Sequence, residues 1–129
     1  MRDFTLRYFT MSGADFWSQR FENNQAIASG AVHADGAPAH FDNTVFINNG
    51  GPETTAGGAV TFSGPVEPKL SNCYFENNTA MYGGAVFLAS RSTAQMDNCT
   101  FVGNNALYQG GAVYMVPAHQ SLNYAVLDC

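Results

Sequence analysis

The chain has 129 residues, of which 46% are hydrophobic and only 12% are charged, and its net charge is −5. A single domain is the expectation at this length. The few basic residues are scattered, which argues against nucleic acid and anionic membrane surfaces as partners, because both bind clustered cations. No apolar run approaches the ~20 residues of a transmembrane helix, so we expect no membrane insertion by this chain.

The N-terminal segment differs from the rest of the chain. Residues 4–9 read Phe-Thr-Leu-Arg-Tyr-Phe, and this alternation of apolar and polar side chains is typical of a β-strand. We therefore assign residues 1–15 to an N-terminal strand or cap segment and residues 16–129 to one repeat domain. The segment contains no continuous apolar core of a signal peptide.

Two short motifs alternate along the repeat domain. F-x-x-N occurs four times, its phenylalanines 25, 29 and 26 residues apart, and the triplet G-A-V follows each copy. The segment that leads into each of these phenylalanines has a fifth copy at residues 122–127, and the sequence ends before a triplet follows it. Self-similarity of this length indicates a solenoid of stacked repeats. The motif residues are Phe21, Phe46, Phe75 and Phe101, then Asn24, Asn49, Asn78 and Asn104, and the glycines Gly30, Gly58, Gly84 and Gly111.

The residues after each triplet glycine alternate in polarity, as in Val86-Phe87-Leu88, and period two predicts strands rather than helices. A single coil cannot bury its own apolar face, so neighbouring coils must cover it. We expect an all-β fold, a right-handed parallel β-helix of about four to five coils. The motif phenylalanines then stack inside it, and the motif asparagines form an amide ladder. A β-sandwich is the alternative, but it does not explain why the same residues recur at the same spacing.

Glycine and asparagine tolerate positive φ and therefore mark the expected turns. We predict positive φ or close backbone approach at the triplet glycines or at the residues before them. Asn72 and Asn78 are expected to bracket the strand around Phe75 as left-handed turn residues.

Two columns of side chains are expected on the outer surface, where contiguous apolar residues mark contacts. One joins Val45 and Ile47 to Tyr74 and Val102. The other becomes aromatic toward the C-terminus and contains the middle residues of the strands after the triplets, His33, Thr61, Phe87 and Tyr114. An interface is the hypothesis for these columns, and ordinary surface is the alternative.

The motifs resemble the repeats of the chlamydial polymorphic outer-membrane proteins, in which F-x-x-N alternates with G-G-A and an aliphatic residue. Asn72-Cys73-Tyr74-Phe75 and Gly83-Gly84-Ala85-Val86 carry the resemblance most closely, and it extends over roughly residues 16–127. The resemblance implies a β-helix of the pectin-lyase type. It also implies the surface-exposed passenger of an autotransporter, with a role in adhesion.

Cys73 and Cys99 fall in one column on adjacent coils. Their spacing is compatible with a disulfide, but two stacked free thiols are the preferred interpretation, because small buried cysteines pack as apolar groups. Cys129 could link to another chain.

No catalytic, cofactor or metal site is expected. The ten acidic residues are spread along the chain rather than paired as glycoside hydrolysis requires. The three histidines, His33, His40 and His119, lack metal-ligand spacing.

We therefore expect a non-enzymatic extracellular or cell-surface protein. The preferred function is a structural subunit that assembles head to tail into a filament, with residues 4–9 of one subunit pairing with the last coil of the next. The alternative is an adhesin-like module that binds a host protein or glycan. A polysaccharide-degrading enzyme is the least favoured of the three.

Overall fold

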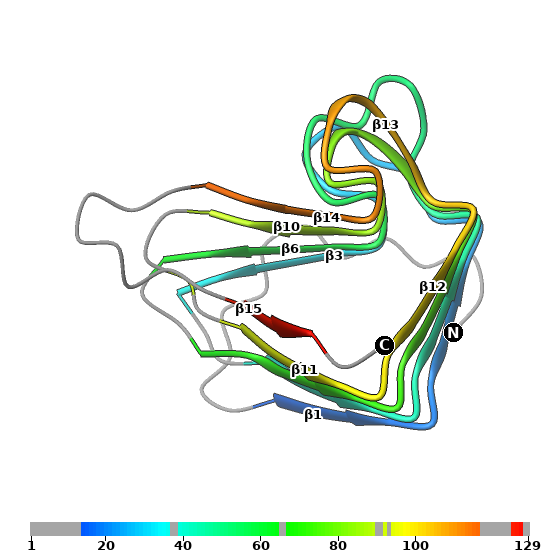
Figure 1. Ribbon diagram of the computed structural model, residues 1–129. Coiled ribbons are helices and arrows are strands. Elements are labelled where there is room, and N and C mark those ends of the chain that lie inside the picture. The colour runs from blue at the N-terminus through cyan, green and yellow to red at the C-terminus, as the bar shows by residue number, and fades with distance from the viewer. Residues whose placement is uncertain are drawn as a thin grey trace.

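The computed structural model describes residues 14–36, 39–64, 67–89, 92, 94–116 and 125–127. Within these residues the fold is a parallel β-solenoid, and none of them is helical. Figure 1 views the molecule along the stack of coils, so that successive strands of each sheet lie behind one another around a central core. The all-β parallel β-helix predicted from the repeats is confirmed.

Each coil contributes one strand to each of three sheets. Sheet I contains β1 (Ala14–Trp17), β4 (Ala39–Asp42), β7 (Lys69–Ser71), β11 (Ala94–Asp97) and β15 (Ala125–Leu127). Sheet II contains β2 (Arg20–Glu22), β5 (Val45–Ile47), β8 (Tyr74–Glu76) and β12 (Thr100–Val102). Sheet III contains β3 (Val32–Asp35), β6 (Val60–Ser63), β10 (Val86–Leu88) and β14 (Val113–Met115).

A lobe projects from the corner between sheets II and III (Figure 1). It consists of residues 50–56 together with β9 (Thr79–Tyr82) and β13 (Asn105–Gln109), which pair with each other in parallel. The solenoid has about three turns, slightly fewer than the four to five coils expected. The difference arises because our count included the partial copies at both ends of the chain.

The motif phenylalanines form a continuous stack inside the solenoid. Strand pairing places them in register in sheet II. The ring centroids lie 5.0, 4.8 and 4.8 Å apart along the stack, and neighbouring rings are within 8° of parallel. Phe21, Phe46 and Phe75 are fully buried, whereas Phe101 on the last coil is only partly buried.

The motif asparagines form a directional amide ladder beside the phenylalanines. Nδ2 of Asn24 donates to Oδ1 of Asn49 (2.9 Å), and the same bond links Asn49 to Asn78 (3.0 Å) and Asn78 to Asn104 (2.9 Å). The backbone N–H of each of the first three asparagines donates to the same oxygen of the next. The ladder thus satisfies buried amides on every interior coil, as buried polar groups require.

Asparagine also makes the corners of the solenoid. Asn43, Asn72 and Asn98 turn the chain between sheets I and II with φ of 50°, 54° and 52°. Asn72 therefore has the predicted left-handed conformation, but the prediction for Asn78 is wrong. Its neighbour Asn77 adopts φ 54°, because the side chain of Asn78 is buried in the amide ladder.

The predicted N-terminal segment is described only at its end. Ala14 and Asp15, which we assigned to that segment, belong to β1 and pair with Ala39 and His40. Residues 4–9 and Cys129 lie outside the described part of the chain.

Candidate functional site

The outer face of sheet III carries the predicted column that becomes aromatic toward the C-terminus. Strand pairing brings His33, Thr61, Phe87 and Tyr114 into register. Thr61 is only 5% exposed, so the prediction that it contributes to the surface is wrong. It is covered because the turn at Gly57 packs directly against its hydroxyl group: a Cβ at Gly57 would lie 2.5 Å from Oγ1.

The predicted column of Val45, Ile47, Tyr74 and Val102 is formed only in part. Tyr74 is half-buried in sheet II, in register with Val45 and Thr100. Val102 is instead in register with Glu76, because the strands pair Phe75 with Phe101. Tyr74 and Val102 are therefore not neighbours in one column.

The glycine pairs fold the lobe back onto sheet III. The first glycine of a pair adopts positive φ, 65° at Gly83 and 71° at Gly110. A Cβ at Gly110 would lie 2.6 Å from the carbonyl oxygen of Val113 and 2.7 Å from Cβ of Tyr114. Only glycine fits such a turn, which brings the end of each lobe strand against the middle residue of the following sheet III strand.

The tightness of this corner depends on the coil. The lobe residues before the glycine pairs are in register as Ala56, Tyr82 and Gln109. In the first of these coils the lobe residue is Ala56 and the middle residue of the sheet III strand is the small Thr61, and both are buried. In the next coil the corresponding residues are the larger Tyr82 and Phe87, and both line a surface groove.

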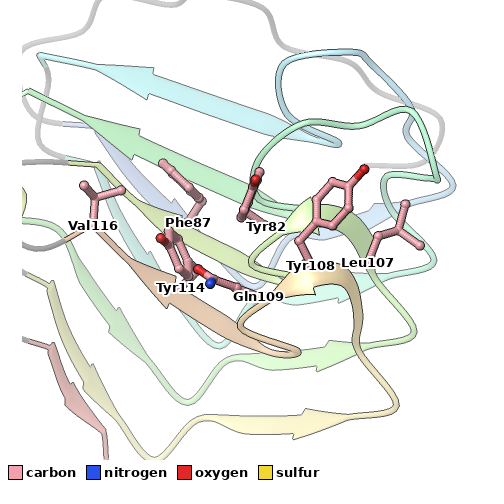
Figure 2. Close-up of a pocket in the computed structure, with 7 residues that line it drawn as sticks. All are labelled: Tyr82, Phe87, Leu107, Tyr108, Gln109, Tyr114 and Val116. Atoms are coloured by element: carbon pink, nitrogen blue, oxygen red, sulfur yellow. The ribbon is translucent and has the colours of Figure 1, made fainter.

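An aromatic groove lies at this corner on the C-terminal coils (Figure 2). Its volume is about 560 Å³. The ring centroids of Tyr82 and Tyr108 lie 5.4 Å apart, those of Tyr82 and Tyr114 5.6 Å, and those of Phe87 and Tyr114 5.5 Å. The lining residues are Tyr82, Phe87, Leu107, Tyr108, Gln109, Tyr114 and Val116.

One inserted residue gives the groove its exposed wall. β13 has five residues where β9 has four, and its register with β9 shifts between Ala106 and Gln109. The irregularity projects Leu107 and Tyr108 from the lobe, where they are 50% and 65% exposed. A β-bulge commonly re-aims side chains in this way.

The sequence analysis found Phe87 and Tyr114 but missed the other five lining residues. Four of these precede a glycine pair, in a stretch we treated as a turn. The signal available was the length of this stretch, four residues between Asn78 and Gly83 but five between Asn104 and Gly110.

A second candidate surface is the rim at the C-terminal end of sheets II and III. A Cβ at Gly30 would overlap the carbonyl oxygen of Gly58, and Gly58 and Gly84 are related in the same way to the following coil. Among the described residues, a Cβ at Gly111 would meet nothing nearer than the carbonyl oxygen of Asn104, 3.8 Å away. β12 and β14 are the last strands of their sheets among the described residues.

The two cysteines of the stacked column are buried free thiols. Sγ of Cys73 lies 3.3 Å from the carbonyl oxygen of Ser71, and Sγ of Cys99 lies 3.4 Å from that of Leu70. A hydrogen bond to Cys99 and burial raise the pKa of the Cys73 thiol, so it stays protonated at neutral pH. These thiols serve as packing groups.

His33 lies at the other end of the sheet III column. Its Nε2 is 3.2 Å from Oγ of Ser63, which donates to Oδ1 of Asp35 (2.8 Å). Burial lowers the pKa of His33, and the Asp35 carboxylate opposes this shift. Among the described residues, no three His, Cys, Asp or Glu side chains are grouped so that they could hold a metal ion.

The comparisons with known proteins identify the repeat. Residues 72–89 and 98–115 match the family described as Chlamydia polymorphic membrane protein (Chlamydia_PMP) repeat. No curated protein and no solved structure matches the chain. In the described residues there is no helix of the length and apolarity needed to cross a membrane. The family and the β-solenoid fold fit a surface-protein repeat. We conclude that this chain is a β-solenoid in which two segments, residues 72–89 and 98–115, are similar to the Chlamydia polymorphic membrane protein repeat.

Proposed function

We propose that this chain is a non-enzymatic structural module of the cell surface or extracellular space, and that its copies stack end to end. The observation that carries the proposal is the space beside Gly111. Gly30, Gly58 and Gly84 must be glycine because the next coil packs directly against each of them. No described residue packs in this way against Gly111. A coil supplied by a second copy would use the glycine at this position.

The rest of the rim supports the same conclusion. Phe101 offers one ring face of the aromatic stack, since the ring of Phe75 covers the other. Asn104 accepts from Asn78 and donates to the carbonyl oxygen of Phe75, and its amide group has a second N–H available for the next coil. Strand edges with unpaired groups readily pair with another chain. A head-to-tail contact of this kind does not close and produces a filament.

The experiment compares two glycine variants by sedimentation over a concentration series, with negative-stain images. We expect the parent to associate as its concentration rises. Gly111→Ala should remain monomeric with an unchanged melting temperature, because its Cβ is accommodated within one chain but obstructs a docking coil. Gly84→Ala is the matched control, and it should lower the melting temperature because its Cβ would overlap the carbonyl oxygen of Gly111.

Two results would overturn the stacking proposal. One is a parent that stays monomeric at high concentration, and the other is a Gly111→Ala variant that assembles as the parent does. Deletion of residues 1–10 tests the partner strand separately. If residues 4–9 pair with the rim, the deletion should abolish filaments, and unchanged filaments would show that another segment occupies the rim.

A second candidate function is an adhesin-like binding module, and the aromatic groove favours it. None of the seven lining residues is charged, so the groove lacks the pair of carboxyl groups that glycoside hydrolysis requires. Its rings and amide group suit binding rather than catalysis.

A further inference from the structure

We propose that the aromatic groove binds a short stretch of a neutral oligosaccharide. The proposal rests on the binding-module candidate and names its ligand class. It depends on the residues of one copy only, so it stands or falls independently of end-to-end stacking.

The size of the groove favours a small ligand over a folded protein. A volume of about 560 Å³ lies within the range of ~300–1,000 Å³ that is usual for small-molecule sites. A stable protein interface instead buries about 800 Å² on each partner, which is more than a corner lined by a few side chains presents.

The chemistry of the lining indicates the ligand class. A pyranose ring has an apolar C–H face and a rim of hydroxyl groups. Tyr82, Tyr108 and Tyr114 each combine a flat ring with a hydroxyl group that donates and accepts hydrogen bonds, and the amide of Gln109 does the same. The rings can stack on the sugar faces while the polar groups bind hydroxyl groups at their edges.

The absence of charge from this lining makes the ligand a neutral sugar. A uronic acid or sulfated sugar would find no cationic partner among the described residues that line the groove, and the chain carries a net charge of −5. Burying an unpaired carboxylate is unfavourable, so charged sugars should be rejected.

The arrangement of the rings also suits a chain of sugars. The rings of Tyr108 and Tyr114 are tilted by 43° and 46° from the ring of Tyr82 that lies between them. Figure 2 shows these side chains around one depression, with Tyr108 at its outer side. Successive sugars could therefore stack on separate rings.

The test is a titration followed by calorimetry and by amide chemical shifts. Cellohexaose and maltohexaose are the neutral probes, and hexagalacturonate is the charged control of equal length. We expect at least one neutral hexasaccharide to bind and to shift the amides of β9, β13 and β14, and hexagalacturonate to bind at least tenfold more weakly. Tyr108→Ala should weaken binding by about tenfold, which corresponds to ~1.4 kcal/mol.

The control variant is Tyr74→Ala, which removes a tyrosine from sheet II that does not line the groove. It should leave binding unchanged. The titrations are repeated in the Gly111→Ala background, so that a failure of stacking cannot be mistaken for a failure of sugar binding.

Three outcomes would overturn the proposal. The first is that neither neutral hexasaccharide shifts the groove amides at 10 mM, a concentration about ten thousand times the Kd of a micromolar site. The second is an equal loss of binding in Tyr108→Ala and Tyr74→Ala. The third is a concentration-dependent shift of the same amides without sugar, which would assign the groove to protein contact.

Discussion

The four stacked phenylalanines occupy equivalent positions in their coils but differ in environment. Phe75 lies between two parallel rings at 4.8 Å and is fully buried. Phe101 has one stacked neighbour and is only partly buried. Because the stabilisation from burial depends on the apolar area removed from water, the two side chains contribute differently to the same stack.

We predict that Phe75→Ala lowers the free energy of unfolding by ~3–5 kcal/mol, as truncation of a buried aromatic usually does. Phe101→Ala should cost clearly less, about 1–2 kcal/mol, since part of its ring is already in water. Chemical denaturation monitored by circular dichroism measures both. Equal losses would mean that the end of the stack is as well covered as its middle.

His33 makes the stability dependent on pH. Its pKa is lowered in the folded state by burial, so below about pH 6.5 the unfolded chain binds a proton that the folded chain resists. The contribution of the neutral His33 side chain to the free energy of unfolding is fully present above about pH 6.5 and is lost as the pH falls through its folded-state pKa. We expect His33→Gln to be less sensitive to a change from pH 7 to pH 5 than the parent in thermal unfolding. A parallel decline in both proteins would assign the acid sensitivity to other groups.

At the scale of the element, β13 shows how one residue changes a surface without changing the fold. Its first residues, Asn105 and Ala106, pair with Thr79 and Ala80 of β9, and pairing resumes at Gln109 with the register shifted by one residue. The extra length is accommodated outside the core because the lobe is not part of the three-sheet stack. Surface segments tolerate such insertions at little cost in stability.

Deleting Leu107 should therefore give β13 the same length as β9. The free energy of unfolding should change by about 1 kcal/mol or less, as is usual for an exposed residue, so the melting temperature should stay within a few degrees of the parent. The same deletion should lower the solvent exposure of Tyr108, because the bulge that projects it is removed. Tyrosine accessibility to a fluorescence quencher provides the measurement. A quenching constant equal to that of the parent would show that the bulge does not place Tyr108.

At the scale of the whole molecule, the solenoid is a one-dimensional stack in which each coil is stabilised by its neighbours. Burial falls on the last described coil: Phe75 in β8 is fully buried, whereas its counterpart Phe101 in β12 is only partly buried. Local opening should therefore begin at the C-terminal rim, where the fewest contacts must be broken.

Native-state hydrogen exchange should show this gradient. We expect the backbone amides of β5 and β8 to exchange at least tenfold more slowly than those of β12 and β14 at low protein concentration, a difference of ~1.4 kcal/mol or more in opening free energy. If copies stack end to end, the protection of β12 should rise with concentration. Uniform protection along the stack at low concentration would contradict the gradient.

Much of the fold could be predicted because the repeat encodes it directly. The recurrence of F-x-x-N and G-A-V at a nearly constant interval has a simple physical basis: each residue type must match its copy in the next coil. The interior ring of Phe75, the amide of Asn78 and the close approach at Gly84 all follow from that requirement. The error at Asn78 came from treating two adjacent asparagines as equivalent, although one turns the chain and the other is buried.

The amino-acid sequence by itself determined the coil, its ladders and the positions of its glycines, because these depend on local conformation and on identical neighbours. Only the tertiary structure decided how the lobe packs against sheet III. This packing buries Thr61 and places Tyr82 and Tyr108 in the aromatic groove. The reason is that the lobe contacts sheet III through turns whose direction depends on non-identical side chains. Burial along the stack was also decided in three dimensions, since Gly84 and Gly111 have the same sequence context but, within the described part of the chain, only Gly84 has a coil packed against it.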